Sequence, residues 1–302
     1  MTTETKTTRA ASPRSGALPT RSHRVTARSR WASVLRHALM LVVVMISLYP
    51  ILWMVVSSLR PDSDIFANPS LLLTSFHWEN YSYGWNALGD PFGKYLLNSG
   101  VIVLGSIIGN LFSCSLAAYA FARLRFRFQR SAFTYMLVTL MLPIHVLIVP
   151  QYILWSQLGL NDSFWPLIVP KFLATDAFFI FLMVQFIRGL PRELDEAARI
   201  DGAGHGRIFL EIILPLMKPA LATTTIFTFI WVWNDFFSQL IFLTSPDNYT
   251  VPIALRSFID AQSTSSFGAM FAMSVVSIIP LILIFAFGQR FLIKGIATTG
   301  LK

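Results

Sequence analysis

Long apolar runs alternate with short polar segments along this chain. A helix needs about 20 apolar residues to cross a bilayer, and six runs satisfy this requirement: 36–58, 95–121, 132–154, 164–187, 219–243 and 268–289. Pro166, Pro170, Lys171 and Asp176 interrupt the fourth run, so its first turns can form an external loop. The pattern predicts an all-α, polytopic membrane protein with six transmembrane helices.

The first 30 residues differ from the rest of the chain. They are rich in Thr, Ser, Arg and Ala and contain almost no large apolar side chains, which is too little apolar surface for a packed core. We therefore expect residues 1–30 to form a disordered cytoplasmic tail and residues 31–302 to form the membrane domain. The first apolar run is longer than the core of a signal peptide, so we expect it to be retained as a span.

Composition agrees with a membrane protein. Hydrophobic residues make up 54% of the chain and charged residues only 13%, and the mean hydropathy is +0.59, which excludes an ordinary soluble domain. The lone cysteine, Cys114, lies within the second run and can form no internal disulfide. Its expected role is packing. The same run contains Gly105 and Gly109, a spacing that lets helices approach closely, within the chain or against a second subunit.

The net charge of +9 is unevenly placed. Residues 1–36 contain eight Lys or Arg and one acid, and residues 123–130 contain four Arg and no acid. Residues 60–94 instead hold two bases against four acids. Cytoplasmic segments are usually the basic ones, so both termini and the segment around Glu196 are predicted to be cytoplasmic. The basic charge then indicates topology and contact with anionic lipid, and we expect no nucleic-acid partner.

One polar segment, residues 188–218, carries five acids and five bases. Pro191 suits the first turn of a helix, and Gly202 and Gly204 can end it with positive φ. Leu194 and Ala198 share one face of such a helix at i, i+4 spacing. Small side chains here permit close approach to a partner, but the residues alone also fit a loop that rests on the protein's own surface.

The order of residues in this segment is Glu196-Ala197-Ala198, then Asp201-Gly202-Ala203, then Ile213-Leu214-Pro215. It resembles the EAA loop of the membrane subunits of binding-protein-dependent ABC importers, most closely the carbohydrate branch and its maltose-type second permease. The resemblance implies the type I ABC importer permease fold and a short coupling helix that docks on a separate ATPase. It assigns ATPase coupling to Glu196, Ala197, Ala198, Asp201, Gly202 and Ala203.

Two further stretches support the same branch. Residues 231–236 resemble an aromatic and polar signature of sugar permeases, and residues 289–302 resemble the tail of the maltose-type subunit. The chain contains no phosphate-binding loop, and the resemblance implies that ATP and Mg bind to two partner ATPase subunits. A second homologous permease and an extracytoplasmic solute-binding protein are the other implied partners, in a bacterial inner membrane. We expect no cofactor and no enzymatic activity in this chain.

Polar residues in the fifth run are candidates for the translocation path. A charged group facing lipid costs at least about 2.5 kcal/mol, so Asn234 and Asp235 should face the bundle interior. With Trp231 and Trp233 they could bind sugar hydroxyls and stack on sugar rings, or Asp235 could cap or bridge helices. Both interpretations stay open for these residues.

Two other polar positions stand out. Asp176 is a further candidate for the path, and its five-residue separation from Lys171 predicts different helical faces rather than an i, i+4 ion pair. His145 is expected to be a hydrogen-bonded structural residue. An ion-coupled secondary transporter using Asp176, Asp235 or His145 is the alternative function, while the absence of a His-Glu-x-x-His pair or a Gly-x-Gly-Asp motif argues against an intramembrane enzyme.

Overall fold

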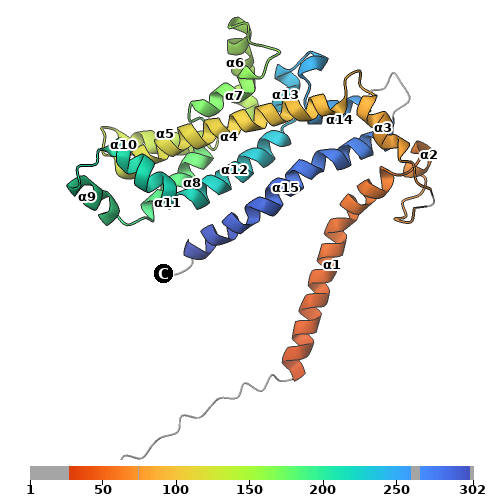
Figure 1. Cartoon of the computed structure of the whole chain (residues 1–302), viewed down its shortest axis with the longest axis horizontal. Helices are drawn as coiled ribbons and strands as arrows, with labels where there is room; N and C mark the ends of the chain where they lie inside the picture. The colour runs from red at the N-terminus through yellow and green to blue at the C-terminus, as the bar shows by residue number, and fades with distance from the viewer. Residues whose placement is uncertain (1–26, 74, 260–265, 300–302) are drawn as a thin grey trace, which may run out of the picture. The chain divides into compact units, whose positions relative to one another are not determined.

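The computed structural model describes residues 27–73, 75–259 and 266–299, and these residues contain no β-strand (Figure 1). Residues 1–26 of the expected tail and residues 300–302 lie outside the described part. The longest helices are α1 (Ala27–Ser57), α4 (Phe92–Arg123), α12 (Lys218–Trp233) and α15 (Phe267–Thr299). The others are α2 (Asp62–Ile65), α3 (Glu79–Asn86), α5 (Gln129–Thr139), α6 (Ile144–Gln157), α7 (Trp165–Phe172), α8 (Ala177–Arg188), α9 (Glu193–Ile200), α10 (His205–Arg207), η1 (Ile208–Ile213), α11 (Leu214–Leu216), α13 (Phe237–Phe242), η2 (Pro246–Asn248) and α14 (Val251–Ser257). The all-α prediction is confirmed.

Four described helical segments are long and apolar enough to cross a membrane: Ser33–Ser57, Phe92–Arg123, Trp165–Arg188 and Phe267–Arg290. A fifth is formed if His205–Leu216 and Lys218–Trp233, bent by 73° at their junction, make one span. The remaining predicted run, 132–154, is divided between α5 and α6. The described helices are therefore consistent with six crossings, although not all are continuous.

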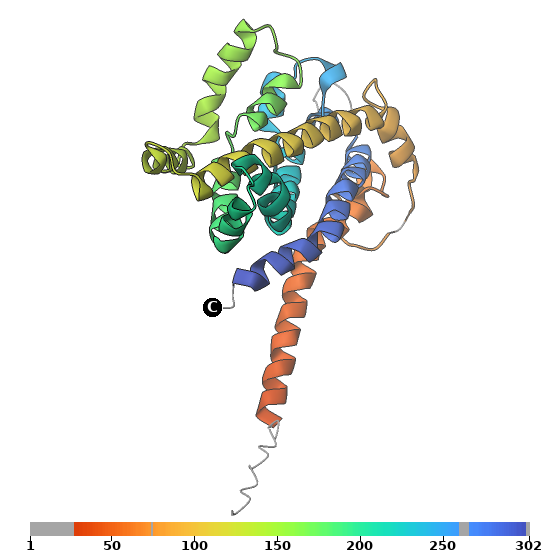
Figure 2. The same cartoon turned by 60° about the vertical axis from the view of Figure 1, so that its left-hand side comes forward.

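Proline chemistry explains the division of the third run. The helix α5 ends at Thr139, and Met141 and Leu142 donate their amides only three residues back, to Val138 and Thr139. Pro143 has no amide proton and disfavours helical backbone at the residue before it. Figure 2 shows the chain changing direction between α5 and α6.

The chain divides into two units, Met1–Pro50 and Ile51–Lys302. The described part of the first unit is the N-terminal portion of α1. In the second unit, α4 is the central element, and its main contacts are with α7, α8 and α12. A second group of contacts joins α15 to α12 and α3.

The two larger of four apolar clusters among the described residues form most of the core of the second unit. One joins α4 to α8 and η1 and includes Cys114, Phe179 and Ile208, all fully buried; Cys114 thus has the packing role expected for it. The other joins α4 to α12, α14 and α15 and includes Trp233 and Met273. The core therefore runs along both halves of α4.

Glycines in α4 allow the close approach of α7. A Cβ at Gly109 would lie 2.8 Å from the Phe172 ring and 2.9 Å from the Lys171 side chain, and one at Gly105 would lie 3.0 Å from Ile168. Since real Cβ contacts are rarely this short, α7 can reach its position only because these residues lack side chains. The small residues of the second run thus serve contacts within the chain.

The Phe92 end of α4 is held by a polar network. Lys94 Nζ lies 2.8 Å from Asp90 Oδ2 and 2.5 Å from Asp247 Oδ1. Asn98 Nδ2 donates to the carbonyls of Asp247 and Tyr249, at 3.0 and 2.8 Å. The contacts with Asp247 and Tyr249 connect α4 to the chain that precedes α14, and the Asp90 contact joins α4 to the segment before it.

Asp162 ties a second loop to the same region. Its Oδ1 accepts the amides of Thr244 and Ser245 at 2.8 and 2.9 Å, its Oδ2 accepts the Ser245 hydroxyl, and its carbonyl accepts from Asn248. Burial opposes ionisation of this carboxyl, but the hydrogen bonds from Ser245 and Thr244 prevail and lower its pKa to about 2. Its φ of 56° is left-handed, a conformation that Asp tolerates better than most residues.

Candidate functional site

A cavity of about 550 Å³ lies among α4, α6, α7, α12 and α13. Four of the five residues expected to line a path, Asp176, Trp231, Asn234 and Asp235, are on its wall. Lys171, His145 and Gln239 line it as well. The volume falls within the range of about 300–1,000 Å³ that is typical of ligand pockets, so this is the candidate ligand site.

Asn234 and Asp235 reach the cavity because the helix stops beside them. The predicted run 219–243 is not one helix: α12 ends at Trp233 and α13 begins at Phe237. Asn234 Nδ2 donates to the Ile230 carbonyl at 2.8 Å, and Asp235 Oδ1 accepts the Ser238 amide at 3.1 Å. Asn and Asp side chains compete with the helix for local backbone groups. Asp235 thus accepts an amide from the first turn of α13 and lines the cavity at the same time.

The two tryptophans lie in different places. Trp231 is 47% exposed, and its ring centroid is 5.3 Å from that of Phe178 and 5.1 Å from that of Phe179. Trp233 is 6% exposed, stacks on Phe229 and donates its indole proton to the Ser277 carbonyl of α15 at 3.1 Å. Trp231 is therefore on the cavity wall, whereas Trp233 joins α12 to α15 and is outside this cavity.

The expectation that Lys171 and Asp176 lie apart is wrong. Lys171 Nζ is 3.0 Å from Asp176 Oδ2 and 3.2 Å from Oδ1. The prediction assumed a continuous helix, but α7 ends at Phe172 and Ala174 takes a left-handed φ of 54°. This break folds the chain back, so the two side chains form an ion pair at the cavity wall.

His145 also departs from expectation. No described residue hydrogen-bonds its ring, which instead packs against Phe237 with 4.8 Å between ring centroids. The ring lines the cavity. It is thus an aromatic wall residue rather than a hydrogen-bonded structural one. The described residues also hold no cluster of His, Cys, Asp and Glu suited to a metal ion.

The segment that resembles the EAA loop contains the expected short helix, α9. It begins two residues after Pro191 and is followed by Gly202 at φ 79°, whereas Gly204 has a negative φ and plays no such part. Asp195 and Ala198 face the protein's own core. Glu196, Ala197, Asp201 and Gly202 are exposed, and Ala203 is half-buried. One face of α9 therefore packs internally and the other is open.

A buried ion pair, not expected from the sequence, attaches α9 to α4. Arg123 Nε is 3.0 Å from Asp195 Oδ2, and the two side chains are 3% and 9% exposed. Arg123 also donates to the Leu190 carbonyl at 2.9 Å. The only signal in the sequence is that both residues are charged and lie in polar segments, and this does not identify them as a pair.

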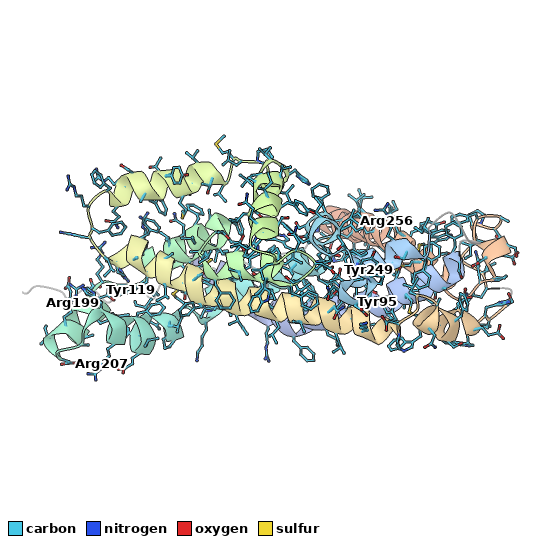
Figure 3. All side chains as sticks on the ribbon, turned by 90° about the horizontal axis from the view of Figure 1, so that it is seen from above. Tyr95, Tyr119, Arg199, Arg207, Tyr249 and Arg256 are labelled. Carbon is cyan, nitrogen blue, oxygen red and sulfur yellow. The ribbon has the colours of Figure 1, made fainter. Side chains whose placement is uncertain are left out.

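Beside α9 lies a pocket of about 650 Å³, lined by residues from the link between α4 and α5 and from α9. Its charged lining residues are Arg123, Arg125, Arg192, Asp195, Glu196 and Arg199. Arg199 and Arg207 lie at one end of the unit, while Tyr95, Tyr249 and Arg256 lie toward the other (Figure 3). The molecule therefore has a central cavity and a separate charged pocket next to α9.

Comparison with known proteins gives these sites a context. Residues 102–298 match the family model of the binding-protein-dependent transport system inner membrane component. The chain is 31% identical to the diacetylchitobiose uptake system permease protein NgcG of Streptomyces coelicolor over 86% of each chain. It is 33% identical to the sn-glycerol-3-phosphate transport system permease protein UgpE of Yersinia pestis, covering 88% of this chain and 96% of that one.

A solved structure shares the fold. It is described as the crystal structure of a bacterial ABC transporter involved in the import of the acidic polysaccharide alginate. It matches with a TM-score of 0.76 and 24% identity, over 88% of this chain and 98% of that one. The chain therefore belongs to the family of inner membrane components of binding-protein-dependent transport systems, as a multi-pass permease subunit of an ABC importer.

Proposed function

We propose that the chain forms half of the translocation path for a neutral sugar or related polyol, and that α9 couples this path to a separate ATPase. The observation that carries the proposal is the pairing of two sites on one scaffold. The central cavity contains Asp176, Trp231, Asn234 and Asp235, and α9 exposes Glu196 and Ala197 on a short helix.

The cavity's chemistry supports a polyhydroxylated ligand. Lys171 supplies donors, Asp176 and Asp235 supply acceptors, and Asn234 supplies both, whereas the buried Gln239 already donates to Val232 and accepts from Thr250. The exposed Trp231 ring offers an apolar face on which a sugar ring can stack. Such alternation of polar groups and an aromatic face suits a sugar better than an apolar ligand.

The charge balance supports a neutral ligand in particular. Lys171 is paired with Asp176, which leaves the Asp235 carboxylate as an excess negative charge on the cavity wall. Like charges in a site of low dielectric repel strongly. We therefore infer that a neutral sugar is preferred over an acidic one, although one relative is named for sn-glycerol-3-phosphate.

Coupling would run from α9 through α4. The buried Arg123–Asp195 pair connects the two helices, and α4 packs on α7, α8 and α12. Those helices carry or flank Lys171, Asp176, Trp231 and Asn234. A displacement of α9 would thus reach the cavity through rigid, packed elements.

The remaining partners follow from the same proposal. Two ATPase subunits would bind ATP and Mg, a second homologous permease would complete the path, and an extracytoplasmic binding protein would deliver the sugar. The basic segments 1–36 and 123–130 favour cytoplasmic termini and a cytoplasmic α9.

Reconstituted uptake tests this proposal. The complex purified through a tag on the full chain should take up a radiolabelled neutral sugar only with ATP and the binding protein. Glu196→Lys should reduce that uptake at least about fivefold, the lower end of ordinary coupling energies, whereas Arg207→Gln, an exposed control on the same segment, should not.

Two results would contradict the proposal. Uptake that is indifferent to ATP but abolished by a protonophore would favour an ion-coupled transporter. Full uptake by the Glu196→Lys variant would separate α9 from energy coupling. Preference for an acidic sugar, with normal ATP dependence, would overturn only the inferred charge of the ligand.

A further inference from the structure

The pocket beside α9 has more positive than negative charge. Its lining contains four arginines but only two acids, Asp195 and Glu196. A neighbouring pocket of about 340 Å³ shares Arg123, Arg125 and Arg192 with it and adds Arg188. The two pockets thus form one basic hollow between α9 and the link that follows α4.

Three of these arginines have no acceptor within the described part of the chain. The Arg123 side chain is engaged by Asp195, whereas the described part of the chain shows no side-chain hydrogen bond, ion pair or ring contact for Arg125, Arg192 or Arg199. All three are exposed. Repulsion among unpaired guanidinium groups in one hollow is relieved most directly by an anion.

The link between α4 and α5 has the pattern of a membrane interface. Leu124, Arg125, Phe126, Arg127 and Phe128 alternate apolar and basic side chains, and Phe126 and Phe128 are 43% and 68% exposed. Directly before it, α4 is an apolar segment long enough to cross a bilayer. Exposed aromatics beside arginines at the end of a span suit the depth of lipid headgroups.

We propose that this basic hollow binds the phosphate of an anionic lipid headgroup. Arg125 from the link and Arg192 and Arg199 from the α9 side would donate to the phosphate oxygens, since guanidinium groups match phosphate geometry. Because these residues belong to two elements, the lipid would bridge them and restrain α9 against the end of α4. Lipid composition would then influence the position of the helix assigned to coupling.

The chemistry alone also fits free phosphate, and the exposed acceptor-free arginines would also attract an acidic protein segment. The alternating apolar residues favour the lipid, because neither a free ion nor an acidic loop needs Phe126 in the lining of the hollow or an exposed Phe128 two residues further on. The proposal goes beyond the proposed function and its test requires no transport, so either can fail without the other.

The test measures lipid binding to the purified full chain in detergent. Phosphatidylglycerol and phosphatidylcholine are titrated against the chain and retention is followed by native mass spectrometry. Phosphatidylglycerol should bind more tightly than phosphatidylcholine, and the variant with Arg125→Gln, Arg192→Gln and Arg199→Gln should weaken its binding at least about tenfold, because each substitution removes a charged donor to the phosphate.

Matched single variants sharpen the result. Arg199→Gln should weaken phosphatidylglycerol binding severalfold, while Arg207→Gln, which removes an exposed charge outside the pocket, should leave it unchanged. Thermal unfolding of each variant checks that it is folded. Equal binding by the triple variant, equal losses in both single variants, or displacement of the lipid by millimolar inorganic phosphate would overturn the proposal.

Discussion

The polar groups at the two ends of α4 differ in whether they find partners within the chain. At the Phe92 end, Lys94 and Asn98 contact Asp247 and the loop before α14, and Asp162 closes a neighbouring loop with several hydrogen bonds. At the Arg123 end, one buried ion pair holds α9, and the surrounding arginines have no described acceptor. The described polar groups at the Phe92 end are paired within the chain, whereas the Arg123 end exposes guanidinium groups that a partner could bind.

The difference indicates where the chain is completed by other molecules. Satisfied networks fix a structure, and polar groups left without partners at a surface are the ones a partner can use. The Phe92 end is therefore expected to behave as a rigid cap. The Arg123 end is expected to respond to what binds there, both protein and lipid.

The largest effect should come from breaking the single buried contact at the α9 end. Arg123→Met leaves the Asp195 carboxylate buried without its partner, which should lower the free energy of unfolding by about 3–5 kcal/mol. The combined Arg123→Met and Asp195→Leu variant should recover most of that stability. Thermal unfolding of the purified variants gives both values, and equal losses in the single and combined variants would show that no pair stabilises α9.

A smaller loss of stability should follow when a side chain is added where α4 and α7 approach each other closely. Gly109→Ala places a methyl group 2.8 Å from Phe172, and overpacking of this kind costs about 1–3 kcal/mol. Gly100→Ala is the matched control, because nothing lies within 4 Å of the new Cβ and alanine favours the helix. If both variants unfold at the same temperature, the packing of α7 on α4 is not as described.

Substitution of Asp162, near the Phe92 end of α4, should lower the free energy of unfolding by a smaller amount. Asp162→Asn removes the charge that accepts the Ser245 and Thr244 amides, at a cost of about 1–2 kcal/mol after allowance for partial exposure. The folded pKa is lowered from 3.8 to about 2, so this stabilisation is complete above pH 3.8 and is lost as the pH falls through 2.

Comparing unfolding midpoints of wild type and Asp162→Asn between neutral pH and about pH 3 follows that loss. The gap between the two proteins should narrow as the pH falls. Glu79→Gln, an exposed acid in the first turn of α3, serves as the control. If the difference in unfolding midpoint between wild type and Asp162→Asn widens toward acid pH, the pKa of Asp162 is not lowered by folding and the described hydrogen bonds do not stabilise its carboxylate.

The smallest effect belongs to the exposed pair at the α9 end. Arg207 and Glu211 are 3.5 Å apart and more than half exposed, so Arg207→Gln should change the free energy of unfolding by no more than about 0.5 kcal/mol. Thermal unfolding measures this directly. A loss comparable to that of Arg123→Met would remove the distinction between buried and exposed charges in this region.

The sequence predicted features that depend on local chemistry. Apolar runs located the four apolar helical segments of the described chain that are long enough to cross a membrane, and Pro191 and Gly202 located the limits of α9, because helix caps act within a few residues. Asn234 and Asp235, expected to face the interior, both line the central cavity. Each of these depends on length, periodicity or side-chain polarity, which a single chain displays.

Features that depend on helix breaks or distant pairing were missed. The Lys171–Asp176 pair requires the left-handed backbone of Ala174, and alanine gives no sign of that conformation. Trp231 and Trp233 are two residues apart, yet only the fold decides which one faces the cavity. Arg123 and Asp195 are distant in sequence, and charge alone could not identify them as partners among several arginines and acids.

The central claim is that the open face of α9 contacts an ATPase on the inner side of the membrane. Ala197→Cys tests it directly, because Ala197 is exposed and the lone native cysteine, Cys114, is buried and can be replaced by alanine. A membrane-impermeant maleimide should label Cys at 197 in inverted vesicles but not in intact cells, and bound ATPase should protect it. Labelling from outside intact cells, or labelling unaffected by the ATPase, would contradict the account.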